Sequence, residues 1–230
     1  MEHEKTFVIS LGGSMVMPGE VNSIFLKDFV TLIDHFVQKG FRFFIVIGGG
    51  KIARTYVDAA RDLGVSDSND LDWIGIQATR LNADLVRSLL RAHAPDKIIY
   101  GKEDAKNYTQ HAVIVGGGWY PGGSSDMATT LLAKENGVKN IINLSNISFV
   151  YTADPKKDPS AMKLTNIQWN EYRKIIPADW TPGSNTPFDP TASKIAEEEK
   201  MEVAVMNGNN LENLEKFLNG EEFEGTLIHP

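Results

Sequence analysis

Residues 6–14 read TFVISLGGS and residues 43–51 read FFIVIGGGK, and these two stretches decide the fold. Each begins with a nearly continuous apolar run, which is typical of a strand that is buried on both faces. Each run then passes directly into glycines. Residues 112–118, AVIVGGG, repeat this pattern. We therefore predict strands over 6–11, 43–47 and 112–115, each followed by a glycine-rich turn.

Helical patterns separate these runs. Apolar residues recur at helical spacing over 25–37, 52–63 and 74–89, with Asn22 as a predicted cap of the first helix, and a further helix is predicted over about 126–135. Shorter strand-like runs occupy 97–100, 140–144 and 203–206. Strands that alternate with helices predict an α/β fold with a mainly parallel central sheet and helices on both faces.

One region differs from this alternation. Six of the ten prolines lie between residues 155 and 190. Proline lacks a backbone donor and has a fixed φ, so this segment is predicted to form loops and short helices rather than sheet. It is a candidate second lobe or lid.

Composition excludes several classes of protein. The 230 residues carry 23 Lys and Arg against 30 Asp and Glu, a net charge of −7 that argues against binding a nucleic acid polymer or an anionic membrane. The absence of cysteine excludes disulfides, thiol catalysis and Cys-ligated metals. The opening residues MEHEK lack the positive charge of a signal peptide, and no apolar run is long enough to span a membrane. The expected location is cytoplasmic.

The glycines indicate what the molecule binds. Ten of the 20 glycines fall in four clusters, at 12–13, 48–50, 116–118 and 122–123. Glycine at the carboxyl end of a parallel strand lets backbone N–H groups approach a phosphate, and Lys51 and Arg54 add positive charge. A tight strand-to-helix turn explains any single cluster equally well, whereas three clusters at three strand ends favour a phosphate site.

Missing motifs narrow the chemistry. The chain has no G-x-x-x-x-G-K-[ST] P-loop, no G-x-G-x-x-G fingerprint and no protein-kinase signature. P-loop hydrolases and dinucleotide oxidoreductases are therefore disfavoured. The five histidines show no metal-binding spacing, so no metal site made by protein ligands alone is predicted.

The motifs taken together resemble a known family, the archaeal-type uridylate (UMP) kinases of the amino acid kinase superfamily. The similarity extends over essentially the whole chain, and its pieces occur in the family's order. They are ISLGGS (9–14), GGGKIAR (48–54), DWIGIQATRLNA (72–83), Pro121-Gly122 to Asp126, Asn146, VYTADP (150–155), FDP (188–190), ASK (192–194) and Gly225-Thr226.

This resemblance implies transfer of the γ-phosphoryl group of ATP, with Mg²⁺, to UMP on an αβα sandwich, the amino acid kinase fold, in a homo-oligomer that is usually a hexamer. It also implies one domain over 1–230, with an acceptor-side lobe at about 1–135 and a nucleotide-side lobe at about 136–230. The implied catalytic residues are Gly13, Ser14, Lys51 and Asp126. The implied UMP-binding residues are Gly49, Asp72, Trp119, Tyr120, Pro121, Gly122, Gly123, Ser124 and Ser125. The implied ATP-binding residues are Gly13, Ser14, Gly50, Arg54, Ser145, Asn146, Tyr151, Asp154 and Lys194.

Several of these residues have simpler interpretations. Asp72 and Asp126 each stand near the start of a helical pattern and are candidate N-caps. Lys51 and Lys194 are candidate solvated lysines, Tyr151 is a candidate packing residue, and Asp154-Pro155 is a candidate turn.

The chain departs from the family at three places. Ser10 stands where many superfamily kinases have lysine, and Ser148-Phe149 stand where Asp-Gly is familiar. Trp119-Tyr120 replace smaller or more polar residues in the loop 119–125, which the resemblance assigns to the acceptor UMP and which we call the acceptor loop. These departures keep open two alternatives: a kinase of another small acceptor, such as a carboxylate, carbamate or isoprenoid phosphate, and a non-catalytic nucleotide- or oxyanion-binding protein.

Overall fold

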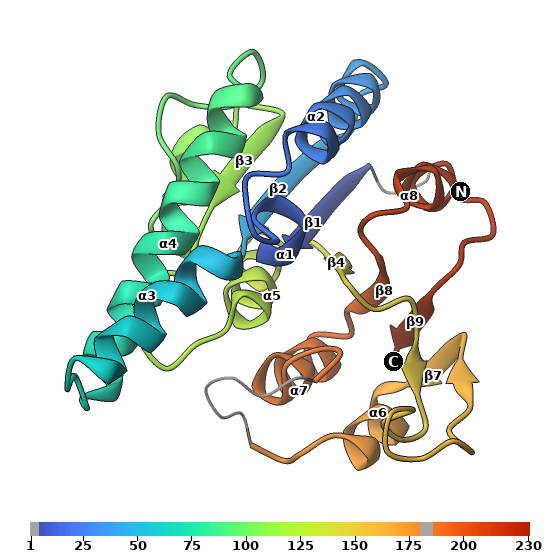
Figure 1. Cartoon of the computed structure of the whole chain (residues 1–230). Helices are drawn as coiled ribbons and strands as arrows, with labels where there is room; N and C mark the ends of the chain where they lie inside the picture. Colours follow the sequence, from blue (N-terminus) through green and yellow to red (C-terminus); the bar gives the residue numbers. More distant parts are fainter. Residues whose placement is uncertain (1–4, 180–185) are drawn as a thin grey trace.

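The computed structural model describes residues 5–179 and 186–230, and its centre is a seven-stranded sheet in the order β3-β2-β1-β4-β8-β9-β7 (Figure 1). β1, β2, β3, β4 and β8 run parallel, whereas β9 is antiparallel to β8. The bounds are β1 Thr6–Leu11, β2 Arg42–Ile47, β3 Val113–Gly116, β4 Asn140–Ser145, β8 Glu202–Asn207, β9 Thr226–His229 and β7 Asn166–Gln168. β5 (Val150–Tyr151) and β6 (Lys163–Leu164) pair with each other outside this sheet.

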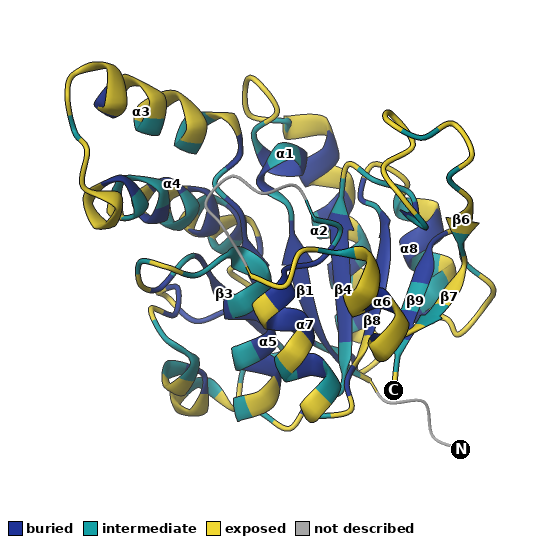
Figure 2. Ribbon diagram, turned by 90° about the horizontal axis from the view of Figure 1, so that it is seen from below, coloured by how far each residue is buried: buried dark blue, intermediate teal, exposed yellow. Residues whose placement is uncertain are grey.

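Helices cover both faces of the sheet (Figures 1 and 2). α1 (Gly13–Val16), α2 (Ser23–Gln38), α4 (Ser68–Leu89) and α8 (Leu211–Leu218) contribute to the core on one face. The 3₁₀ helix η1 (Lys102–Tyr108), α5 (Ser125–Glu135), α6 (Trp169–Ile175) and α7 (Pro190–Glu198) contribute to the core on the other. α3 (Gly50–Asp62) packs along α4 at the side of the molecule. The predicted αβα sandwich is confirmed.

Side chains of each central strand alternate between the two cores. In β1, Phe7, Ile9 and Leu11 enter the α2 side, whereas Val8 enters the α5 side. This alternation follows from the two-residue period of a strand, and burial on both faces explains why the sequence of β1 is almost wholly apolar. Ser10 is the polar member of this run and lies on the α5 side, where its hydroxyl reaches Asp126.

Most predicted elements are confirmed within a few residues. Asn22 caps α2, its side chain accepting a hydrogen bond from Phe25 N. The strand predicted over 97–100 is wrong, because Ile99 forms only an isolated bridge to Gly116. The chain turns away directly afterwards, where Tyr100 N donates to Asp104 Oδ2 at 2.9 Å.

The proline-rich segment is part loop and part sheet. The short helix α6 agrees with the prediction, and Asp154 Oδ1 accepts from Lys156 N at 3.0 Å in the predicted turn. The prediction that sheet is absent is wrong, because β6 and β7 fall in this segment and β7 joins the edge of the main sheet. No proline lies between residues 160 and 176, so the backbone donors that strands need are present there. Pro182 lies outside the described residues.

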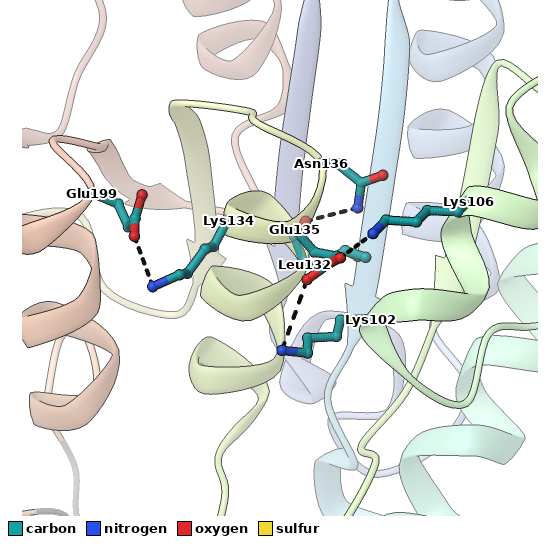
Figure 3. A network of polar contacts seen from close by, with 7 residues as sticks. All are labelled: Lys102, Lys106, Leu132, Lys134, Glu135, Asn136 and Glu199. Carbon is teal, nitrogen blue, oxygen red and sulfur yellow. Dashed lines mark hydrogen bonds and ion pairs between the residues drawn. The ribbon is translucent and has the colours of Figure 1, made fainter.

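The end of α5 that lies away from the glycine turns is tied to its neighbours by polar contacts (Figure 3). Glu135 pairs with Lys102 and Lys106 of η1, and Lys134 pairs with Glu199, the C-cap of α7, at 2.7 Å. These side chains are partly exposed, so each pair contributes little to stability. Together they help to orient α5 between η1 and α7. Among the described residues, no helix is long and apolar enough to cross a membrane.

Candidate active site

Two glycine turns meet at the carboxyl edge of the sheet. β1 and β2 are parallel neighbours, so Gly12-Gly13 and Gly48–Gly50 emerge side by side. The contact is so close that a Cβ on Gly13 would lie 2.0 Å from Gly50 N. Gly50 has φ +64°, a left-handed conformation that favours glycine. Glycine is therefore required here both by packing and by backbone conformation.

The sheet itself uses some of the amides in these turns. Gly12 N donates to Leu144 O at 2.8 Å and Gly48 N donates to Leu11 O at 2.9 Å. The carbonyls of Gly48 and Gly49 accept from Asn82 Nδ2 on α4, at 2.9 and 3.2 Å. The turn at residues 48–50 is therefore hydrogen-bonded to both β1 and α4, and these contacts fix the position at which α3 begins.

Two positively charged side chains lie at this edge of the sheet. Lys51 and Arg54 lie on the first turns of α3 and are exposed. Neither forms an ion pair with another residue of the described ranges 5–179 and 186–230. The N-terminus of a helix of this length favours an anion, and both side chains remain available to one.

Asp126 links three parts of the fold. Its Oδ1 accepts from Ser10 Oγ of β1 at 2.9 Å and from Asn143 Nδ2 of β4 at 3.3 Å. Its Oδ2 accepts from the backbone N–H of Asp189, the N-cap of α7, at 3.2 Å. Asn143 also donates to Pro187 O at 3.2 Å. One carboxylate therefore joins the start of α5 to two strands and to the start of α7.

Burial raises the pKa of Asp126 to about 6, with a smaller upward contribution from the nearby charge of Asp189. The hydrogen bond from Ser10 acts in the opposite direction and lowers the pKa. The interpretation of Asp126 as an N-cap is wrong, because Ser124 caps α5 and accepts from Met127 N at 3.1 Å. Asp126 lies inside the helix, so its carboxylate does not cap α5 and instead accepts the three hydrogen bonds described above.

The acceptor loop, which connects β3 to α5, contacts α4. Gly122 N donates to Asp72 Oδ2 at 2.8 Å. Asp72 is likewise not an N-cap, because Asp67 caps α4 and accepts from the amides of Asn69 and Asp70. The structure therefore brings Asp72 to the loop that the sequence similarity assigns to the acceptor.

Side chains of the loop point in different directions. Trp119 is buried in the core beside α5, and its Nε1 has no hydrogen-bond partner among the described residues. Tyr120 is half exposed. The hydroxyl of Ser124 is engaged as the cap of α5. Any contribution of Trp119 at the surface of the loop would come from its backbone.

The residues predicted for ATP lie along the other half of the edge. Ser145 ends β4 and its Oγ accepts from Ile147 N at 3.4 Å, while Asn146 beside it is exposed. Tyr151 pairs with Lys163 in the β5–β6 hairpin. Asp154 lies in the turn after β5, and Lys194 is exposed on α7.

Sequence reasoning missed Asn143, and it assigned no role to Asp189, Thr79 and Arg80, although the motifs FDP and DWIGIQATRLNA contain them. The Asp189-Pro190 pair was a usable signal, since an N-cap aspartate before proline is a common helix start. Asn143 gave no signal, because a lone amide in an apolar strand does not indicate its partner.

Two cavities lie away from this edge. One of about 240 Å³ is lined by Lys5, Arg42 and Gly137 among others, and one of about 420 Å³ lies between α8 and Phe149. Phe149 is buried, with the Lys163 ammonium 4.9 Å from its ring. Among the described residues, no group of three or more His, Asp or Glu side chains is placed to hold a metal ion.

Comparison with known proteins identifies the family to which this fold and its glycine turns belong. The sequence profile of the amino acid kinase family matches residues 5–207, and the chain belongs to that family. A uridylate kinase from Hyperthermus butylicus is 34% identical over 224 residues, covering 96% of both chains. A uridylate kinase from Archaeoglobus fulgidus is 38% identical over 225 residues, covering 96% of this chain and 98% of the relative.

Solved structures agree with this assignment. The crystal structure of the Archaeoglobus fulgidus uridylate kinase superposes with a TM-score of 0.84 at 37% identity, covering 96% of this chain and 99% of the other. A UMP kinase from Bacillus anthracis has a TM-score of 0.79 at 23% identity, covering 98% and 96%, and supports the fold.

Proposed function

We propose that this protein is a UMP kinase, which transfers the γ-phosphoryl group of ATP to UMP and yields UDP and ADP. The observation that carries the proposal is the similarity to uridylate kinases over 96% of this chain and of the relative. An oxygen of the UMP phosphate attacks the γ-phosphorus, and the bond between that phosphorus and the β–γ bridging oxygen breaks. No proton has to be removed from the nucleophile, so the protein's task is to position and neutralise two anions.

The two glycine turns suit this task. Gly13, Ser14, Gly49 and Gly50 present backbone amides beside the first turn of α3, and backbone donors stabilise phosphate oxygens without a charged side chain being desolvated. Lys51 and Arg54 add charge from α3. We assign Gly50 and Arg54 to ATP and Gly49 to UMP.

Asp126 is assigned the role of a positioning residue. Its three hydrogen bonds hold the starts of α5 and α7 against β1 and β4. Ser10 takes the place at which superfamily relatives have lysine, so the positive charge has to come from elsewhere. Lys51, Lys194 and Arg54 are the candidates.

Asp72 and the loop Trp119–Ser125 are assigned to UMP. The carboxylate of Asp72 already accepts from Gly122 N, and it is the acceptor offered to the nucleoside hydroxyls or base N–H. A hydrogen bond to a charged group contributes about 1.5–3 kcal/mol, so a monophosphate that lacks a donor at this place is expected to bind less tightly. Ser145, Asn146, Tyr151, Asp154 and Lys194 are assigned to ATP.

Magnesium fits the donor set as an ion held mainly by substrate. Mg²⁺ prefers carboxylate and phosphate oxygens and keeps several waters. Asp126 and Asp189 provide the carboxylates at this edge, but the oxygens of Asp126 already accept three hydrogen bonds. We therefore assign the ion to the ATP phosphates, where it neutralises charge on the transferred group.

We also propose a homo-oligomer, with the hexamer of the family as the expected state, and a cytoplasmic location among nucleotide substrates. Oligomerisation is supported by a stripe at helical spacing, which consists of Ile52, Tyr56 and Ala59 of α3 and its C-cap residue Leu63. Tyr56 is 63% exposed and Leu63 is 86% exposed, so these two side chains are not covered within one chain. Figure 2 shows that much of α3 is exposed. The acceptor-side lobe, 1–135, and the nucleotide-side lobe, 136–230, share one continuous sheet through the β1–β4 pair.

A coupled assay of ADP release tests the function. MgATP is offered with UMP, CMP, dTMP, GMP and AMP in turn, and ADP release confined to UMP is expected. Turnover of another monophosphate instead of UMP would show that the acceptor is wrongly assigned. If no monophosphate is turned over while a nucleotide still binds, the protein is a non-catalytic nucleotide-binding protein.

A further inference from the structure

Arg80 of α4 reaches the acceptor loop at its first residues. Its Nε donates to Gly118 O and its Nη2 donates to Trp119 O, both at 3.2 Å. Arginine suits this geometry because its planar fork can donate to two neighbouring carbonyls at once.

Aromatic rings hold the guanidinium in place. The central carbon of the guanidinium lies 5.7 Å from the ring centre of Trp73 and 5.0 Å from that of Tyr100. Trp73 comes from α4 and Tyr100 from the segment before η1, and both rings are about half exposed. Cation–π contacts of this kind restrict the side chain without neutralising its charge.

Thr79 binds the backbone N–H of the same residue, Gly118. Gly118 N donates to Thr79 Oγ1 at 2.6 Å, and the hydroxyl donates onward to Ile76 O at 2.7 Å. The N–H and the carbonyl of Gly118 are therefore both bound to α4.

The glycines allow this close approach. A Cβ on Gly117 would lie 2.7 Å from Thr79 Oγ1 and 2.9 Å from Arg80 N. A Cβ on Gly118 would lie 3.1 Å from Ile76 Cγ1. Side chains at either position would separate the loop from α4, so the glycines of this cluster serve the contact with the helix.

The two ends of the loop are held differently. At the base, Gly118 and Trp119 are bound by two side chains, and the Trp119 ring is buried. At the tip, one hydrogen bond within the part of the chain that the structure describes joins Gly122 to Asp72, and it is exposed. The carboxylate at the tip is also the group assigned above to UMP.

We propose that Arg80 is a positioning residue for the acceptor, which anchors the base of the loop 118–124 so that its tip can exchange the Asp72–Gly122 hydrogen bond for contacts with a nucleoside monophosphate. This inference rests on the proposed function for the identity of the acceptor. The anchoring itself does not depend on that function. Arg80 does not contact the acceptor in this scheme and acts through the backbone of Gly118 and Trp119.

The test compares Arg80→Ala and Arg80→Lys with Arg61→Ala, a matched removal of an exposed arginine on α3. Amide hydrogen exchange of residues 117–123 is measured first. Exchange at least about tenfold faster in Arg80→Ala, confined to this loop, is expected from the loss of two charge-assisted hydrogen bonds. Lysine cannot donate to both carbonyls in the same plane, so Arg80→Lys is expected to restore only part of the protection.

Kinetics separate positioning from a general loss of structure. Arg80→Ala is expected to raise the KM for UMP about tenfold while the KM for ATP stays within about twofold, because within the described residues the side chains that hold this loop belong to α4 and not to the residues assigned to ATP. Thr79→Val, which conserves volume but removes the hydroxyl, is expected to loosen the same loop, and it serves if Arg80→Ala does not fold.

Unchanged exchange in the loop, or KM values for UMP and ATP that rise together, would overturn the inference. If the wild-type protein does not phosphorylate UMP, the proposed function fails. The exchange measurement then still decides whether Arg80 anchors the loop.

Discussion

Ser10 Oγ donates a hydrogen bond of 2.9 Å to Oδ1 of Asp126, and the two residues are 116 positions apart in the chain. Ser10 is the last residue but one of β1, between the buried apolar residues Ile9 and Leu11. Asp126 lies in the first turn of α5 above the same face of the sheet. Ser10 provides a hydroxyl and not a cation, and Asp126 forms no ion pair within residues 5–179 and 186–230, so burial raises its pKa.

Asp126→Asn tests the buried charge through stability. The pKa of Asp126 is about 6 in the folded protein against an ordinary value of 3.8, so the folded state favours the protonated acid. That stabilisation is present below about pH 4 and is lost as the pH rises through about 6. The wild-type protein should therefore lose roughly 1–3 kcal/mol relative to Asp126→Asn between pH 4 and pH 7. Denaturant unfolding at both pH values measures this, and a difference that does not depend on pH would contradict the raised pKa.

Asp126→Asn also tests catalysis. Asparagine keeps one acceptor oxygen and replaces the other with an N–H₂ donor, so either the Asp189 backbone N–H or the donors of Ser10 and Asn143 lose their acceptor. We expect kcat to fall by about 10²-fold or more, with the far-UV circular dichroism unchanged. A variant with normal kcat would exclude a positioning role.

Ser10→Ala separates the hydroxyl from the carboxylate. The hydrogen bond from Ser10 lowers the pKa of Asp126, so its removal should raise that pKa further. Asp126 positions its neighbours by accepting hydrogen bonds at both oxygens, which requires the ionised carboxylate, so the acid limb of the pH–rate profile is expected to move to higher pH. Thr31→Ala, an exposed hydroxyl on α2, is the control and should leave the profile in place.

Gly13→Ala tests the contact between the glycine turns. The new Cβ would lie 2.0 Å from Gly50 N, and backbone atoms on both sides cannot move aside cheaply. We expect a loss of about 1–3 kcal/mol of stability together with the loss of activity. Gly19→Ala places a methyl group where nothing lies within 4 Å and should be close to neutral in both measurements. Equal effects of the two substitutions would refute the close contact.

Arg54→Ala tests the proposed assignment of this cation to ATP. Arg54 is exposed and makes no ion pair within the described ranges, so its removal should leave stability within about 0.5 kcal/mol. The KM for ATP is expected to rise about tenfold, as the loss of a charge-assisted phosphate contact implies. The KM for UMP should change less, and the opposite pattern would reassign Arg54 to the acceptor.

The apolar stripe of α3 predicts self-association. Tyr56→Glu with Leu63→Glu should lower the molar mass measured by light scattering, because charge is introduced into a surface that a second copy would cover. Arg61→Glu lies on another side of the same helix and should leave the mass unchanged. A wild-type protein that is monomeric at micromolar concentration would rule out the proposed oligomer.

Local pattern was enough to predict much of this molecule. The apolar runs of β1, β2 and β4 and the glycines that follow the first two were predictable, because a strand buried on both faces needs apolar residues throughout. The parallel order then required the glycine turns to meet at one edge, and they do. The exposed stripe of α3 was not predictable, since a helical period shows which residues share a face but not what covers that face.

The sequence by itself determined the fold class, the edge of the sheet at which ligands bind and the resemblance to uridylate kinases, because these depend on local periods and on motifs a few residues long. Only the tertiary structure decided which polar side chains meet. Ser10 and Asp126 are joined across 116 positions, and Arg80 meets Gly118 across 38. Such pairs leave no local pattern, because they arise when the packing of α5 and α4 on the sheet brings distant segments of the chain together.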